Sequence, residues 1–177
     1  MIGLQGDALT FGLAPDPSKE VLDTRFGAEG DGTLVETCPL ARLYAETIKH
    51  RLYRHGGLAL LIDYGGWRSK GDTLQAMKNH AYVDPLDEPG RADLTAHVDF
   101  EILAWLWPQH RYTTQGAFLT ALGIDARAAR LAQGLSGAAL ENHLAAHRRL
   151  TQGQEMGSLF KVLALFGPDA PPPAGFA

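Results

Sequence analysis

Apolar positions along this chain form one run that predicts a buried strand. Residues 58–63 are apolar up to Asp63, without alternation, and glycines lie on both sides of the run. A short unalternated run of this kind is typical of a strand buried on both faces, as in parallel α/β sheets. Ligands of such sheets bind at the carboxyl ends of strands, so Asp63 and Tyr64 are the first candidate site residues. Asp63 could equally cap the turn that follows.

A helix is predicted immediately before this strand. Apolar side chains recur at three- and four-residue steps through residues 39–55, at Leu40, Leu43, Tyr44, Ile48 and Leu52. Charged side chains take the opposite face, which is typical of an amphipathic helix. Pro39 suits the first helical position and Gly56 suits the left-handed turn that ends a helix. Helix, turn and strand form an αβ unit, so the predicted class is α/β.

The rest of the chain adds a hairpin, a second strand and several helices. An N-terminal β-hairpin is predicted because apolar runs at 1–4 and 8–13 flank a short link that contains Gly6. Residues 160–166 form a second strongly apolar run and predict another strand. Between the two apolar strands we expect a helix at 72–80, a segment at 93–100 that leads into a helix through about residue 107, a strand at 111–113, and helices starting at 114, 126 and 136. The chain therefore has an inserted helical segment before its last strand.

Composition indicates an ordinary globular domain. The chain has 177 residues, of which 45% are hydrophobic and 20% charged, which is enough for one core and too little for two. We expect residues 1–167 to form a single domain. Residues 168–177 are rich in proline and lack the apolar side chains needed for a core, so this tail is expected to be disordered.

Charge and cysteine content limit the partners. The net charge is -4, so the sequence gives no basic field for binding nucleic acid or an anionic membrane. It has no apolar stretch of roughly 20 residues and no signal-peptide pattern at its start. The single cysteine, Cys38, cannot form an internal disulfide, which fits a reducing compartment. A cytoplasmic location is the expectation.

Polar side chains are concentrated in the segments after the first apolar strand. The catalytic candidates are the carboxylates of Asp63, Asp72 and Asp99. The substrate-binding candidates are Tyr64, Thr73, His80, Thr95 and His97. Loops at one end of a strand share one edge of the sheet, so these side chains, apart from Thr73, are expected to meet in one concavity. The alternative is that the aspartates only cap turns and helices.

No metal site and no cofactor loop are predicted. His97 and Asp99 are spaced like a ligand pair, and His143 and His147 lie one helical turn apart, but neither pair belongs to a ligand-rich motif. The glycines of residues 27–32 are spaced like those of a phosphate-binding loop. They precede a β-leaning segment instead of a helix, which argues against that use.

Five segments, taken in order, resemble the C-terminal half of the MidA family of class I S-adenosylmethionine-dependent methyltransferases. They read GGLALLIDYG, GDTLQAMKNH, DPLDEPGRADLTAHVDF, TTQGAFLTALGI and EMGSLFKVLAL. The resemblance implies half of a Rossmann-like sheet. It also implies that residues 160–166 return antiparallel beside residues 58–63.

The resemblance further implies an activity. S-adenosylmethionine is the family's cofactor, and the mitochondrial members methylate an arginine on a subunit of respiratory complex I and support its assembly. A protein substrate is therefore implied, in the cytoplasm or, in a eukaryote, in the mitochondrion. Nothing in residues 1–36 matches the family's glycine-rich cofactor loop or its acidic ribose ligand. The chain is thus expected to be a fragment that does not bind the cofactor alone and self-associates through an exposed strand edge.

Two functions follow from these expectations. In the first, the chain is the substrate side of a methyltransferase, where carboxylates grip the guanidinium of an arginine in a bidentate fork and favour one nitrogen as nucleophile. In the second, it is a non-catalytic module that docks a partner protein.

Overall fold

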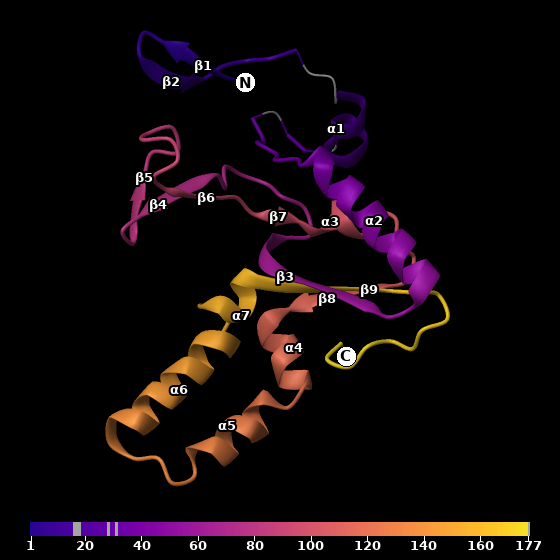
Figure 1. Cartoon of the computed structure of the whole chain (residues 1–177), viewed down its shortest axis with the longest axis vertical. Coiled ribbons are helices and arrows are strands. Elements are labelled where there is room, and N and C mark those ends of the chain that lie inside the picture. Colours follow the sequence, from indigo (N-terminus) through magenta and orange to yellow (C-terminus); the bar gives the residue numbers. More distant parts are fainter. Residues whose placement is uncertain (16–18, 28, 31, 177) are drawn as a thin grey trace. The chain divides into compact units, whose positions relative to one another are not determined.

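The computed structural model describes residues 1–15, 19–27, 29–30 and 32–176, and the chain divides into two compact units (Figure 1). Unit 1 contains Met1–Glu36 and Lys70–Ala96. Unit 2 contains Thr37–Ser69 and His97–Ala177. In the part of the chain that the structure describes, no helix is long and apolar enough to cross a membrane.

Unit 1 begins with the predicted hairpin. Strands β1 (Ile2–Gln5) and β2 (Ala8–Phe11) pair antiparallel around a turn in which Gly6 has a φ of 63°. This left-handed conformation favours glycine, as the sequence predicted for a hairpin link. Helix α1 (Lys19–Phe26) follows, in a segment whose interrupted apolar pattern supports no prediction.

The predicted helix at residues 72–80 is wrong. Strands β4 (Gln75–Lys78), β5 (Ala81–Val83) and β6 (Asp93–Thr95) form an antiparallel sheet in the order β5-β4-β6. Asn79 and His80 connect β4 to β5 with φ values of 51° and 63°. Two central residues with positive φ match the twist of paired strands, and asparagine and histidine tolerate that conformation better than most residues. A hairpin turn therefore replaces the helix.

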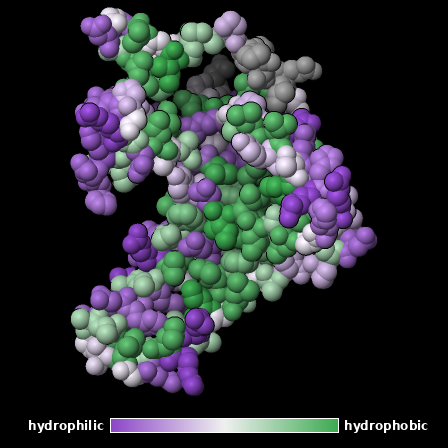
Figure 2. All heavy atoms as spheres, viewed as in Figure 1, coloured by the Kyte–Doolittle hydropathy of each residue, from purple (hydrophilic) through white to green (hydrophobic). Residues whose placement is uncertain are grey.

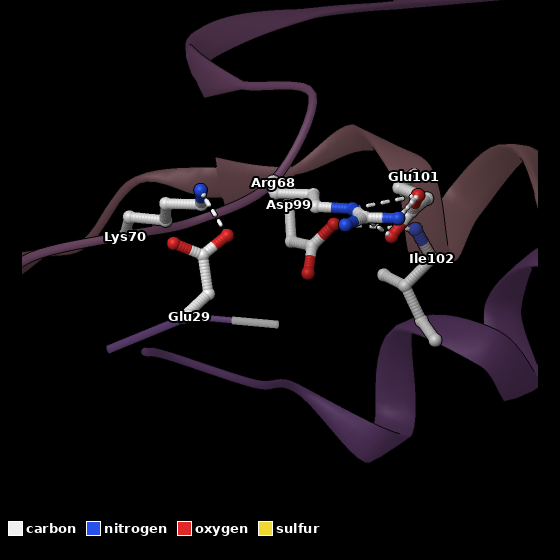
Figure 3. Close-up of polar contacts among 6 residues, drawn as sticks. All are labelled: Glu29, Arg68, Lys70, Asp99, Glu101 and Ile102. Atoms are coloured by element: carbon white, nitrogen blue, oxygen red, sulfur yellow. Dashed lines mark hydrogen bonds and ion pairs between the residues drawn. The ribbon is translucent and has the colours of Figure 1, made fainter. Parts of the chain in front are cut away.

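Polar contacts join the two chain segments of unit 1. The Glu36 carboxylate accepts hydrogen bonds from the Thr73 amide, at 2.8 Å, and from the Thr73 hydroxyl. Lys70 pairs with Glu29 at 2.5 Å between Nζ and Oε1 (Figure 3). The two segments of unit 1, which flank residues 37–69 in the sequence, are thus held together.

The sheet of unit 2 contains both predicted apolar strands. It consists of β3 (Leu58–Gly66), β7 (Val98–Asp99), β8 (His110–Thr114) and β9 (Phe160–Phe166), in the order β7-β3-β9-β8. β3 and β9 are antiparallel, with Leu58 opposite Phe166 and Tyr64 opposite Phe160. The predicted antiparallel neighbours are confirmed. β7 runs parallel to β3 and pairs with it at Gly65 and Gly66.

Six helices surround this sheet in the described part of unit 2. They are α2 (Pro39–His55), α3 (Phe100–Ala104), α4 (Gln115–Ala121), α5 (Ile124–Ala132), α6 (Gly137–Thr151) and α7 (Met156–Leu159). α2 begins at Pro39 and ends at Gly56, as predicted. The helix that residues 93–100 were predicted to lead into is α3, which starts at Phe100 with Asp99 as its N-cap and ends a few residues before the predicted end at about residue 107. The inserted helical segment before the last strand is confirmed.

The core of unit 2 lies between the sheet and helices α2 and α3. Its buried members are Ala45, Leu52, Phe100, Leu103, Ala104, Trp107, Leu163 and Leu165. Figure 1 shows α2 and α3 on one side of the sheet and α4, α5 and α6 on the other. At the C-terminal end, the Phe176 ring packs against Phe118 with 5.1 Å between centroids. The boundary between a domain and a disordered tail at residue 167 stays a prediction.

The prediction that β3 is buried on both faces is wrong. Ala59 and Leu61 pack on the core, whereas Leu58, Leu60 and Ile62 are 43%, 43% and 49% exposed. The three exposed side chains alternate with the packed ones, so they share the opposite face of the strand. Figure 2 shows an extended apolar surface over this part of unit 2. An apolar run without alternation does not reveal that only one of its faces is covered.

The phenol of Tyr112 in β8 is expected to lose its proton at an unusually high pH. Its ring packs against Trp67 and Phe100, and burial raises its pKa to about 12. In the unfolded chain the phenol ionises near pH 10, so between about pH 10 and 12 the folded state holds a proton that the unfolded state has lost. Stability therefore falls over that interval.

Absorbance at 295 nm during a pH titration checks this expectation. Tyr112→Phe is expected to remove the last tyrosine step, whereas Tyr82→Phe, at an exposed position, is expected to leave that last step in place. Loss of a step near pH 10 in the Tyr112→Phe chain, while circular dichroism still shows the fold, would contradict the burial effect.

Candidate functional site

The carboxyl end of β3 brings together four of the predicted site residues. Asp63 and Tyr64 lie near the end of β3 itself. Pairing with β7 puts Asp99 opposite Gly66, and His97 comes directly before β7. All four belong to unit 2, and they lie where ligands of α/β sheets bind.

Asp63 is partly buried and has a local hydrogen bond. Its Oδ1 accepts the amide proton of Tyr64 at 2.8 Å. In the antiparallel register Asp63 is directly opposite Lys161 of β9, so the two side chains point to the same face of the sheet. The hydrogen bond from the Tyr64 amide supports the interpretation of Asp63 as a turn cap. The charged side chain of Lys161 on the same face supports its interpretation as a site residue.

Tyr64 is the centre of an aromatic group. Its ring lies edge-on to His97, with 5.9 Å between centroids, and edge-on to Phe160, with 5.5 Å between centroids. Edge-to-face packing fixes the orientation of these rings. The three rings give the end of β3 a firm apolar wall.

Asp99 is buried and caps helix α3. It is 6% exposed, and its Oδ1 accepts the amide proton of Ile102 at 3.3 Å (Figure 3). The capping interpretation of Asp99 therefore has a direct contact. Because the cap fixes its carboxylate beside the β3–β7 pairing, Asp99 also stays at the candidate site.

The sequence did not single out an ion pair that fixes the loop after β3. Arg68 Nε lies 2.9 Å from Glu101 Oε1 and 3.0 Å from Oε2, and Figure 3 shows the two side chains pointing toward each other. The Glu101 amide also donates to the Trp67 carbonyl at 2.8 Å. Charge-assisted bonds of this forked kind are strong and directional. They tie the loop to the first turn of α3.

A hollow of about 600 Å³ opens beside the end of β3 in unit 2. Gly65, His97 and Lys161 border it on the sheet side, and Arg149 and Glu155 border it on the helical side. Glu155 is paired with Arg148, at 3.4 Å between Oε1 and Nε. The hollow has the size of a small-molecule or side-chain pocket.

Lys161 is a site residue that the sequence analysis missed. Burial lowers the pKa of its ammonium group, whose Nζ donates to the carbonyls of Ser158 at 2.5 Å and Leu159 at 3.2 Å. The available signal was that Lys161 is the one charged residue in the apolar run of residues 160–166. A charge inside such a run demands a polar partner or a function.

The other four predicted site residues belong to unit 1. Thr73 is buried and bound to Glu36, so it has a structural role there. Asp72 and His80 are exposed, and Thr95 ends β6. Convergence on one concavity of the seven candidates other than Thr73 stays a prediction.

A larger hollow of about 960 Å³ in unit 1 does not change this choice of site. It lies between β2 and residues 84–89. None of the eight predicted site residues borders it. The smaller hollow, which His97 and Gly65 border, is therefore the better candidate.

The two histidines of α6 have protein partners. His143 Nε2 lies 2.9 Å from the Ala128 carbonyl, and His147 Nε2 lies 2.8 Å from Asp125 Oδ1. Both contacts tie α6 to α5. Over the described ranges, no group of three or more histidine, cysteine or acidic side chains could hold a metal ion.

The glycine-rich stretch does not fit a cofactor loop. Gly27 comes directly after helix α1. The β-structure that follows the stretch is the isolated bridge between Val35 and Lys70. A nucleotide-binding loop follows a strand and opens a helix, which is the reverse order. We therefore assign no cofactor contact to the described residues of this stretch.

Comparison with known proteins gives a consistent family. A family model described as "Putative S-adenosyl-L-methionine-dependent methyltransferase" matches residues 3–118. The mitochondrial protein arginine methyltransferase NDUFAF7 of Xenopus tropicalis is 32% identical over 185 residues, which cover 97% of this chain and 42% of that protein. The NDUFAF7 homolog of Drosophila melanogaster is 39% identical over 128 residues, which cover 67% of this chain and 29% of that one.

Solved structures from Burkholderia thailandensis are similar as well. The crystal structure of an uncharacterised superfamily protein has a TM-score of 0.81 and 28% identity, and the match covers 99% of this chain and 50% of that one. A structure of a superfamily member bound to S-adenosyl-homocysteine has a TM-score of 0.80, also at 28% identity. The chain thus spans less than half of these curated relatives and about half of the solved chains.

Proposed function

This chain belongs to the S-adenosyl-L-methionine-dependent methyltransferase family whose model matches it, and on that premise we propose that it supplies the acceptor side of a protein arginine methyltransferase. The observation that carries the proposal is that the Asp63 carboxylate, the paired rings of Tyr64 and His97, and the hollow that His97 and Lys161 border all lie at the carboxyl end of β3. A carboxylate beside aromatic rings suits a planar cation.

Asp63 has the central role in this proposal. A guanidinium has a pKa above 12 and is a poor nucleophile, so its orientation must favour one nitrogen. The free lone pairs of the Asp63 carboxylate can accept two parallel hydrogen bonds from the acceptor.

The cofactor of the proposed reaction is S-adenosylmethionine, as for the family to which the chain belongs. S-adenosylmethionine supplies an electrophilic methyl group when it is bound. The residues of this chain bind and orient the acceptor nitrogen, and the Asp63 carboxylate stabilises the guanidinium charge before transfer.

The methyl acceptor and the cellular location of this chain are proposed by similarity to the named relatives. NDUFAF7 of Xenopus tropicalis is named a mitochondrial protein arginine methyltransferase. We accordingly propose a protein substrate, with a respiratory complex I subunit or its bacterial equivalent as the acceptor. The proposed place of action is the cytoplasm of a bacterium or the mitochondrion of a eukaryote.

A chimera with the Burkholderia thailandensis protein tests the proposal. These 177 residues would replace the half that they match, in the wild-type form and with Asp63→Asn. Methylarginine formed in a protein extract with tritiated S-adenosylmethionine is expected to fall by about tenfold or more in the variant, which corresponds to about 1.4 kcal/mol of lost transition-state stabilisation. Binding of S-adenosyl-homocysteine, measured by calorimetry, is expected to stay the same.

The control is Asp7→Asn, which changes an exposed aspartate in the hairpin turn of unit 1. This variant is expected to keep full methylation. If Asp63→Asn methylates as well as the wild-type chimera, Asp63 does not orient the acceptor. If the wild-type chimera binds S-adenosyl-homocysteine but forms no methylarginine, the result favours a non-catalytic docking module.

A further inference from the structure

The hollow beside the end of β3 has more positive than negative charge on its border. The border includes the ammonium group of Lys161 and the guanidinium of Arg149, but only one carboxylate, that of Glu155. Glu155 is paired with Arg148, at 3.4 Å between Oε1 and Nε, so a cation of α6 already balances its charge. The two border cations therefore remain to attract an anion.

Arg149 has no anionic partner in the described part of the chain. No ion pair and no hydrogen bond involves its side chain there. It lies in the last turn of α6, where the helix dipole stabilises a cation. All five N–H donors of its guanidinium are thus available to a ligand.

Lys161 has one unused donor. An ammonium group has three N–H donors, and two of them point to the carbonyls of Ser158, at 2.5 Å, and Leu159, at 3.2 Å. Among the described residues, no third acceptor and no carboxylate pairs with this group. The two carbonyls fix the position of Nζ without neutralising its charge. Burial lowers the pKa of the ammonium, and a bound anion would stabilise its charged form.

These charges decide which part of a substrate can enter the hollow. A guanidinium would be repelled by Lys161 and Arg149, because like charges at short range destabilise each other. A carboxylate would be attracted by both groups and could accept hydrogen bonds from both. The hollow and the Asp63 carboxylate therefore favour groups of opposite charge.

We propose that the hollow binds an acidic side chain of the substrate protein, whose carboxylate is held by Lys161 and Arg149. The inference rests on the proposed function, because it takes the acidic residue to belong to the same segment as the arginine at Asp63. It adds a specificity for acidic residues close to the acceptor.

The strand register indicates how close the two residues are. Lys161 is directly opposite Asp63, and both side chains point to the same face of the sheet. In an extended peptide, side chains on one side recur every second residue, at a spacing of about 7 Å. An acidic residue two positions from the arginine would therefore reach the hollow.

Titration of the isotope-labelled 177-residue chain with three blocked heptapeptides, followed by NMR, tests the proposal. The first peptide is Gly-Glu-Gly-Arg-Gly-Glu-Gly, the second has glutamine in place of both glutamates, and the third has citrulline in place of the arginine. The glutamate peptide is expected to bind about fivefold or more tightly than the glutamine peptide, through charge-assisted bonds, and to shift amide signals within residues 149–161. The chain's net charge of -4 favours the glutamine peptide at long range, so this preference would come from the local cations.

Lys161→Gln and Arg149→Gln are each expected to reduce the preference for glutamate to about twofold or less, since each removes one cation. The matched control is Arg130→Gln, which makes the same change of charge at an exposed position of α5 that does not border the hollow. This variant is expected to keep the full preference. Circular dichroism checks folding, and the exposed Arg149 keeps the test valid if Lys161→Gln does not fold.

Three results would overturn the proposal. They are equal binding of the glutamate and glutamine peptides, no shift within residues 149–161, or a preference that persists in both Lys161→Gln and Arg149→Gln. The citrulline peptide separates this inference from the proposed function. If it binds as tightly as the arginine peptide while the glutamate preference remains, the carboxylate site is supported and only the role of Asp63 fails.

Discussion

Phe100→Ala is expected to destabilise unit 2 by about 3 to 5 kcal/mol. Phe100 is fully buried at the start of α3, where its ring lies 5.5 Å from the Tyr112 ring and joins the core between α2 and the sheet. Truncation removes the buried ring and leaves a cavity that the packed neighbours fill only in part. Urea unfolding followed by circular dichroism measures the loss.

Trp105→Ala is the matched control for Phe100→Ala. Trp105 lies at the end of the same helix but is 54% exposed, so its removal is expected to change the free energy of unfolding by less than about 1 kcal/mol. Equal losses in the two variants would mean that the core of unit 2 is not centred on α3.

Gly157→Ala is expected to have the second large effect. A Cβ atom at Gly157 would lie 2.1 Å from the Thr151 carbonyl oxygen and 2.6 Å from the Gln152 carbonyl oxygen, and these are backbone atoms that cannot rotate away. Gly116 of α4 meets the same carbonyl, and its Cβ would lie 3.3 Å from the Gly157 Cα. The two glycines thus allow α4, the end of α6 and α7 to cross in contact. We expect a loss of about 3 kcal/mol or failure to fold, as in severe overpacking.

Gly167→Ala provides the comparison for this glycine. A Cβ at Gly167, just beyond β9, meets nothing within 4 Å. Its midpoint in thermal unfolding is expected to match the wild type within a few degrees, whereas that of Gly157→Ala should fall by about 10 °C. If Gly157→Ala unfolds at the same temperature as the wild type, the crossing of α4, α6 and α7 can widen without loss of stability.

Several features followed from the sequence because they depend on local patterns. Helix α2 begins at Pro39 and ends at Gly56, where the residue types themselves set the backbone angles. The N-terminal hairpin and the helix that starts after Thr114 also follow from local turn and cap chemistry. The antiparallel pairing of β3 and β9 came from the family resemblance, and the register confirms it.

The errors have one physical cause: the structure of these segments is set by contacts with residues that are distant in sequence. Residues 75–83 form a hairpin because β6 completes their sheet, and the polar residues before them suggested a helix cap instead. Lys161 became a candidate only when β9 put it opposite Asp63.

The sequence by itself determined the α/β class, the family, the position of α2 and the two apolar strands of unit 2. The tertiary structure alone decided which predicted site residues share the end of β3, and that Arg68 and Glu101 hold the loop beside it. It also decided that Leu58, Leu60 and Ile62 are exposed. The physical reason is that an apolar side chain has a tendency to be buried, whereas its actual burial depends on whether another element covers the face of the strand on which it lies.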